Sequence, residues 1–195
     1  MKVNFVKTFI PSKDFVAVEK VGNKMLVRFD AVKDADMDAY SCVEGSVSES
    51  EYDEQEVRRE YEAWKQKWAE KALVLAKKAK IAEIAAYDTS DNVNGFMLNG
   101  LLVWLDKATR VGLMNSTTIA KSAGQKTTTL WLGGIKLVVD CDKAIQLLSA
   151  LEMYALDCFN VTASHKQAVS ELTTIEEVEA YDYKAGYPKM LEMSV

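Results

Sequence analysis

One sequence pattern occurs twice in this chain. It reads Phe-Met-Leu-Asn-Gly-Leu-Leu-Val-Trp-Leu-Asp-Lys-Ala at residues 96–108 and Leu-Trp-Leu-Gly-Gly-Ile-Lys-Leu-Val-Val-Asp-Cys-Asp-Lys-Ala at residues 130–144. Each copy is an apolar run that a turn pair interrupts, Asn99-Gly100 or Gly133-Gly134, and each ends in Asp-Lys-Ala. Such pairs predict tight hairpins, because both central residues of a type I′ turn need a positive φ. We therefore expect two hairpin-plus-helix units, with a four-stranded antiparallel sheet packed on helices.

The rest of the C-terminal half supplies the helices of this expected domain. Apolar periodicity predicts a helix over residues 106–122 and a second, stronger one from about residue 142 onward. A capping signal at residues 173–177 predicts a short helix that ends near residue 183, and residues 190–195 are expected to form a final edge strand. The predicted C-terminal α+β domain covers residues 88–195.

The first part of the chain has the composition of a small β unit. Residues 3–10 and 15–29 are rich in Val, Phe, Ile and Leu, and the turn-forming pairs Pro11-Ser12 and Gly22-Asn23 punctuate them. This pattern predicts a β meander within residues 1–48. The fold class expected for the whole chain is therefore α+β.

A long amphipathic helix is expected between these parts, at residues 49–87. Ser50 and Asp53 resemble a capping box, and neither Gly nor Pro interrupts the stretch that follows. Steps of three and four residues place one set of side chains on a single stripe. The stripe consists of Val57, Tyr61, Trp64, Trp68, Ala72, Leu75, Ala79 and Ala82.

This stripe is the best candidate for an interface with another protein. At 1.5 Å per residue such a helix would reach about 54 Å, more than the width of a small domain, so part of it must pack on another subunit or stand clear. Tryptophan and tyrosine are also enriched in interface cores. The predicted partner-binding residues are Val57, Tyr61, Trp64, Trp68 and Leu75. The alternative is that the N-terminal β unit folds back and covers this face.

Composition limits the partners and the environment. A net charge of −5 gives no electrostatic reason to bind nucleic acid or an anionic membrane. The sequence contains neither an apolar run of about 20 residues nor the apolar core of a signal peptide at its start, so we expect a soluble protein. Its three cysteines include no Cys-x-x-Cys pair, which favours reduced structural thiols.

No motif in the sequence points to catalysis, a metal ion or a cofactor. His165, the only histidine, falls on an apolar helix face, where a structural role is expected. Cys158 lies seven positions earlier, about 10.5 Å along a helix, too far to share a zinc ion with it. Asp140 and Asp142 are expected to cap a helix, and Glu152 and Asp157 lie on different sides of the same helix. We therefore expect no enzyme activity and no cofactor.

Trp104 and Trp131 occupy similar places in the two repeats. Tryptophans at matching strand positions favour a shared core. The alternative is that they are exposed and stack on a sugar or a peptide.

Residues 79–188 resemble a domain-of-unknown-function family that is frequent in phages and prophages of Bacteroidales and occurs in some tail fibre assembly proteins. The most specific part of the resemblance is the tail from Glu177 to Pro188, with Tyr-Asp-Tyr followed by Gly-Tyr-Pro. Further matching segments are Lys80-Ile81-Ala82-Glu83-Ile84, Val93-Asn94-Gly95-Phe96 and Leu151-Glu152-Met153-Tyr154-Ala155.

The resemblance implies a phage tail context. We expect a non-enzymatic, minor structural component of the tail or tail fibres, which acts through contacts with other tail or fibre proteins and forms a homo-oligomer. One alternative is a tail fibre assembly chaperone that is absent from the mature particle, and another is a carbohydrate- or peptide-binding module. The expected location is the virion tail, or the host cytoplasm during assembly.

Overall fold

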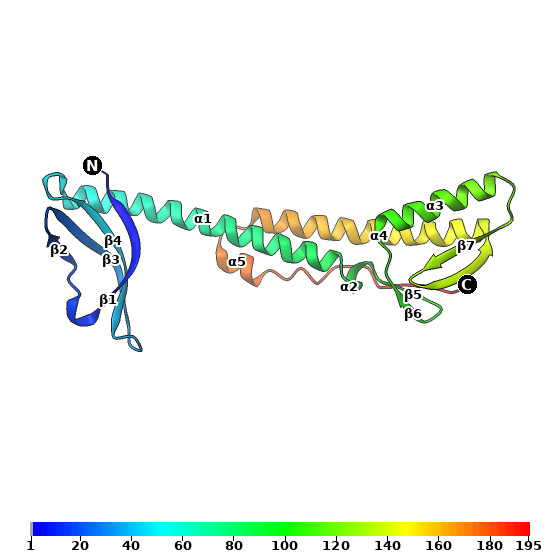
Figure 1. Ribbon diagram of the computed structural model, residues 1–195, viewed down its shortest axis with the longest axis horizontal. Helices are drawn as coiled ribbons and strands as arrows, with labels where there is room; N and C mark the ends of the chain where they lie inside the picture. The colour runs from blue at the N-terminus through cyan, green and yellow to red at the C-terminus, as the bar shows by residue number, and fades with distance from the viewer. Residues whose placement is uncertain (1) are drawn as a thin grey trace. The chain divides into compact units, whose positions relative to one another are not determined.

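The computed structural model describes residues 2–195, in two compact units, Met1–Ala72 and Leu73–Val195 (Figure 1). The boundary falls within the long helix α1 (Glu54–Asp88). The sequence predicted this helix as a part of its own at residues 49–87, between units at 1–48 and 88–195. Contacts instead assign its first part to the N-terminal unit and the rest to the C-terminal unit, and the α+β class is confirmed.

The N-terminal unit contains a four-stranded antiparallel sheet with strand order β1-β4-β3-β2. The strands are β1 (Asn4–Pro11), β2 (Val18–Val21), β3 (Lys24–Asp34) and β4 (Ala39–Ser48). The expected β unit is thus present. Strand β4, which the sequence did not predict individually, lies in the middle of the sheet between β1 and β3.

The first turns of α1 bury their apolar stripe on this sheet. Val57 and Tyr61 form one core cluster with four sheet residues, Val27, Phe29, Val43 and Val47. Tyr61 also donates a hydrogen bond of 2.8 Å to Asp30, and Lys65, one turn later, donates one of 2.6 Å to the same carboxylate oxygen. Asp30 lies where the β3–β4 register shifts, so α1 holds this irregularity in place.

Both predicted hairpin-plus-helix repeats are present in the C-terminal unit. The first repeat consists of β5 (Phe96–Leu98), β6 (Leu101–Val103) and α3 (Lys107–Ser122). The second consists of β7 (Thr127–Leu132), β8 (Ile135–Asp140) and α4 (Cys141–Glu171). Asn99, Gly100, Gly133 and Gly134 all have positive φ, as type I′ turns require.

The two hairpins do not join in the expected four-stranded antiparallel sheet. Strand β5 pairs with β6 on one side and, in parallel, with the final strand β9 (Leu191–Met193) on the other, while β7 and β8 form a separate ladder. The backbone of the second hairpin's turn packs closely on the Val103 side chain of β6: a Cβ added at Gly133 would lie 2.9 Å from Val103 Cγ1. The hairpins therefore meet by packing and not by backbone pairing.

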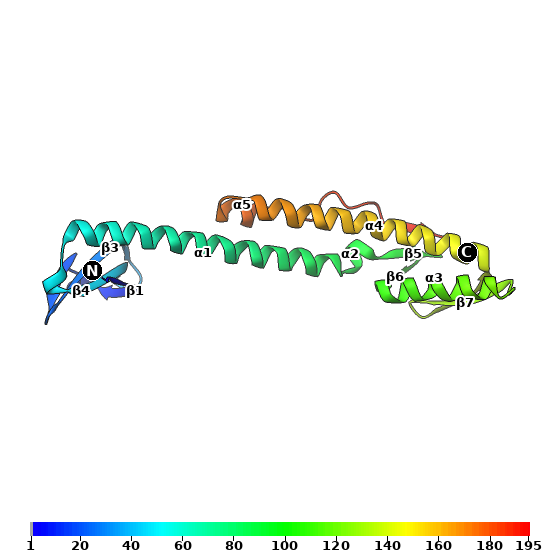
Figure 2. The same ribbon diagram turned by 90° about the horizontal axis from the view of Figure 1, so that it is seen from above.

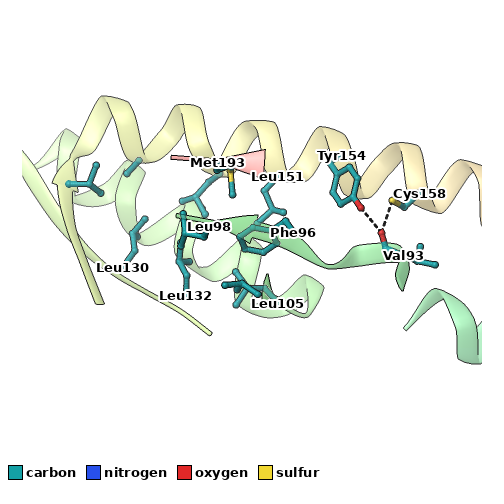
Figure 3. Packing of buried hydrophobic residues seen from close by; sticks show 14 residues of the cluster. Val93, Phe96, Leu98, Leu105, Leu130, Leu132, Leu151, Tyr154, Cys158 and Met193 are labelled. Carbon is teal, nitrogen blue, oxygen red and sulfur yellow. Dashed lines mark hydrogen bonds between the residues drawn. The ribbon is translucent and has the colours of Figure 1, made fainter. Parts of the chain in front are cut away.

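The main core of the C-terminal unit lies between these hairpins and α4 (Figure 3). Phe96, Leu98, Leu130 and Leu151 are among its fully buried side chains. At one end of the core Tyr154 donates hydrogen bonds of 2.8 Å and 3.1 Å to the carbonyl oxygens of Val93 and Gly95.

A second cluster joins the C-terminal half of α1 to α4 and α5 (Ile175–Ala180), and α1 and α4 lie side by side here in both views (Figure 2). Ile84, Val169 and Val178 form its buried centre. Thr174 and Glu177 make the predicted capping box at the start of α5. A short helix, α2 (Asp91–Asn94), links α1 to β5.

Candidate binding sites

The predicted partner-binding stripe is divided by the structure. The sheet of the N-terminal unit covers Val57 and Tyr61, so these two side chains are core residues and are not available to a partner. This is the outcome in which the β unit folds back on the helix. Trp64 is half-buried, while Trp68 and Leu75 keep 48% and 56% of their surface exposed.

Trp68 ends a ladder of aromatic rings that starts in the core. Tyr61 stacks on Trp64 with ring centroids 6.0 Å apart, and Trp64 stacks on Trp68 at 5.6 Å. Phe5 of β1 packs against Trp64 at 5.6 Å, and the ammonium group of Lys7 lies 5.5 Å from the Trp68 ring centroid. Trp68 is therefore packed on Trp64 and Lys7, although half of its side chain is exposed.

Strand β1 adds a second exposed aromatic side chain to this region. Side chains two residues apart on a strand share a face, so Phe9 lies on the same face of β1 as Phe5 and Lys7. Phe9 is exposed, and β1 is an edge strand. We call the surface formed by Lys7, Phe9, Trp64 and Trp68 the Trp68 face.

The C-terminal unit contains an open cavity of about 420 Å³ beside Trp104. Three segments contribute to its wall: the end of α1 with α2, the segment from Trp104 to Arg110, and one face of α4. On α4 the lining residues are Glu152, Ala155, Leu156 and Phe159, a spacing that repeats about once per helical turn. We call this hollow the Trp104 cavity.

Trp104 is therefore not the core residue that its strand position favoured. It follows β6, keeps 37% of its surface exposed and lines the cavity. Trp131 is 59% exposed, and the ammonium group of Lys136 lies 6.0 Å from its ring centroid. The expectation of a shared tryptophan core is wrong, because the leucines and valines of the two hairpins fill that core.

An ion pair in the wall of the cavity joins α3 to α4. Arg110 is only 8% exposed, and its Nε donates a hydrogen bond of 2.9 Å to Glu152 Oε1. Its Nη1 donates one of 2.7 Å to the Leu105 carbonyl oxygen. Across residues 2–195 no group accepts a hydrogen bond from Arg110 Nη2. Arg110 is one of the residues that line the cavity.

Three further charged groups line the same cavity. Asp106 caps α3, and its pKa is lowered chiefly by the hydrogen bond from the Thr109 hydroxyl, so the carboxylate is ionised at neutral pH. Asp88 accepts a hydrogen bond of 2.7 Å from the Thr162 hydroxyl. Lys107 adds a second cation beside Arg110.

His165 has the structural role that the sequence predicted. Its Nε2 lies 2.9 Å from the Ala185 carbonyl oxygen, to which it donates, and its Nδ1 lies 2.8 Å from the Tyr181 hydroxyl. Both ring nitrogens are thus occupied by the segment that follows α5. Glu152 pairs with Arg110.

The three cysteines, Cys42, Cys141 and Cys158, are free and buried, as expected for reduced structural thiols. The Cys158 thiol donates to the Val93 carbonyl oxygen at 3.1 Å, and burial raises its pKa. Within residues 2–195 no group of three or more His, Cys, Asp or Glu side chains is placed to hold a metal ion. Asp140 caps α4 as predicted, by accepting from the backbone N–H groups of Asp142 and Lys143.

Fold and cavity together define a two-unit α+β protein with an exposed aromatic face in one unit and a polar, aromatic-lined cavity in the other. Residues 75–185, more than half of the chain, match the family described as Domain of unknown function (DUF4376). The chain belongs to this family. Neither a curated protein nor a solved structure matches it. None of the helices within residues 2–195 is long and apolar enough to cross a membrane.

Proposed function

We propose that this chain is a non-enzymatic, phage tail-associated protein, a minor structural component of the tail or tail fibres that acts through protein–protein contacts. The phage context rests on the resemblance of residues 79–188 to proteins of phages and prophages. The observation that carries the binding role is the exposed Trp68 side chain, which stacks on Trp64 at the end of the aromatic ladder. A preordered aromatic side chain loses little entropy on binding and is a typical interface anchor.

The partners that we propose are other tail or fibre proteins, and a second copy of this chain in a homo-oligomer. The Trp68 face fits a protein surface, because it combines aromatic planes with the edge strand β1, which has unpaired backbone groups. A tail fibre assembly chaperone would use the same face but would leave the fibre after assembly.

The role of the Trp68 face is tested by replacing Trp68 with Ala. The matched control is Trp131→Ala, which removes a tryptophan of similar exposure from the other unit. Native mass spectrometry of each variant and co-purification with tail and fibre proteins from infected cells would be measured. We expect Trp68→Ala to lose the assembly that wild type and Trp131→Ala retain. Equal assembly of all three proteins would contradict the proposal.

A further inference from the structure

We propose that the Trp104 cavity is a binding site for a neutral saccharide. Its volume of about 420 Å³ lies in the range typical of small-ligand sites. All of its lining residues belong to the C-terminal unit, so the proposal is independent of the Trp68 face.

The cavity offers the two surfaces that a sugar ring needs. One is apolar: the exposed rings of Trp104 and Phe159 line it and can pack on the C–H face of a pyranose. The other is polar: Glu152, Asp106 and Lys107 lie in the same wall and can bond to hydroxyl groups.

Arg110 gives the polar side a fixed donor. The buried guanidinium is held through Nε and Nη1 by Glu152 and the Leu105 carbonyl oxygen, which leaves Nη2 for a ligand. A donor held by its own protein contacts pays little ordering entropy when a hydroxyl oxygen binds. The same contacts fix Leu105, the residue after Trp104, and so position the proposed stacking ring.

The charges of the cavity favour a neutral ligand over an ionic one. Asp88, Asp106 and Glu152 contribute three carboxylates, against the two cations Lys107 and Arg110. The carboxylates repel an anionic ligand and the two cations repel a cationic one. Each of these charged groups can form a charge-assisted hydrogen bond with a neutral hydroxyl. A sialylated or sulfated glycan would bring a further negative charge into a cavity whose lining has one more carboxylate than cations.

The first step of the test is a printed array of neutral, sialylated and sulfated glycans, probed with the full chain. The best-bound glycan is then titrated while the indole N–H signals are followed by NMR. Three variants are compared with wild type: Trp104→Ala, Phe159→Ala and Trp131→Ala. Phe159 is an exposed helix residue, so its loss tests the cavity even if Trp104→Ala does not fold.

The expected result is binding of neutral glycans, a saturable shift of the Trp104 signal, and an affinity at least about tenfold lower in Trp104→Ala and Phe159→Ala. Trp131→Ala should bind like wild type. Four results would overturn the proposal: an empty array, preference for anionic glycans, equal loss in Trp131→Ala, or a Trp104 shift that depends on protein concentration alone. The last would show that a second copy covers the cavity.

Discussion

Arg110 and Glu152 join α3 to α4 by a hydrogen-bonded ion pair of 2.9 Å, although 42 positions separate them in the sequence. The same guanidinium group holds the Leu105 carbonyl oxygen, so one buried side chain fixes the start of α3 and the segment that presents Trp104. The ion pair therefore links the stability of the C-terminal unit to the geometry of the Trp104 cavity.

Replacing Glu152 with Ala should lower the free energy of unfolding by about 2 kcal/mol, because it leaves the buried Arg110 cation without its carboxylate. Glu152→Gln keeps an acceptor for Arg110 Nε and should cost about 1 kcal/mol. Urea unfolding of both variants measures the difference. If Glu152→Ala is as stable as wild type, the ion pair does not stabilise the unit.

Tyr154→Phe should cost about 1 kcal/mol, since it removes the donor that serves the carbonyl oxygens of Val93 and Gly95. Burial raises the pKa of Tyr154 to about 12, above the value of about 10 for an unfolded tyrosine. Wild type should therefore lose stability as the pH rises from about 10 to about 12, because the unfolded state ionises first. Stability measured across this range should fall less steeply in Tyr154→Phe. Identical alkaline slopes would contradict the assignment.

Asp30→Asn should remove a pH-dependent part of the stability of the N-terminal unit. The hydrogen bond from Lys65, followed by the one from Tyr61, lowers the pKa of Asp30. Its contribution is present above the unfolded value of about 4 and is lost as the pH falls through the lower folded value. Asparagine keeps the left-handed backbone, φ 47°, that Asp30 adopts. Acid unfolding is followed by Trp64 and Trp68 fluorescence. As the pH falls, the stability of Asp30→Asn should decrease less than that of wild type. If stability depends on acidic pH in the same way in both proteins, the Asp30 carboxylate does not stabilise the N-terminal unit.

Gly100→Val should cost about 1–2 kcal/mol, because a β-branched residue resists the φ of +79° at this turn. A Cβ at Gly100 would meet no atom within 4 Å, so the cost is backbone strain and not a clash. Gly100→Asn is the matched control, since asparagine tolerates the left-handed region, and it should cost less. Thermal unfolding distinguishes the two variants. If both variants are equally stable, the turn does not impose the strain.

Local signals were sufficient to predict much of the fold. The Asn99-Gly100 and Gly133-Gly134 turns, the long helix and the Thr174 capping box all depend on residues close in sequence. The parallel pairing of β9 with β5 joins segments that are distant in the sequence. The sequence therefore predicted the final strand but not the strand with which it pairs. Pairing between distant segments is also the reason why the four-stranded antiparallel sheet predicted for the C-terminal domain is wrong.

The sites were predicted less well than the fold, for the same physical reason. The apolar stripe of α1 was correct as a pattern, but a pattern does not say whether a partner or the chain's own sheet covers Val57 and Tyr61. The Trp104 cavity depends on Arg110 and Glu152 meeting across two helices. The spacing of Glu152, Leu156 and Phe159 on α4 was the one local signal for it.

The proposal that this chain is a structural component of a phage tail is tested most directly by mass spectrometry of purified particles of a phage whose genome contains this sequence. If the chain is such a component, it should be present in a fixed ratio to the tail or fibre proteins. Its absence from the particle, together with a complex to a fibre protein in infected-cell lysate, would contradict the claim and identify an assembly chaperone.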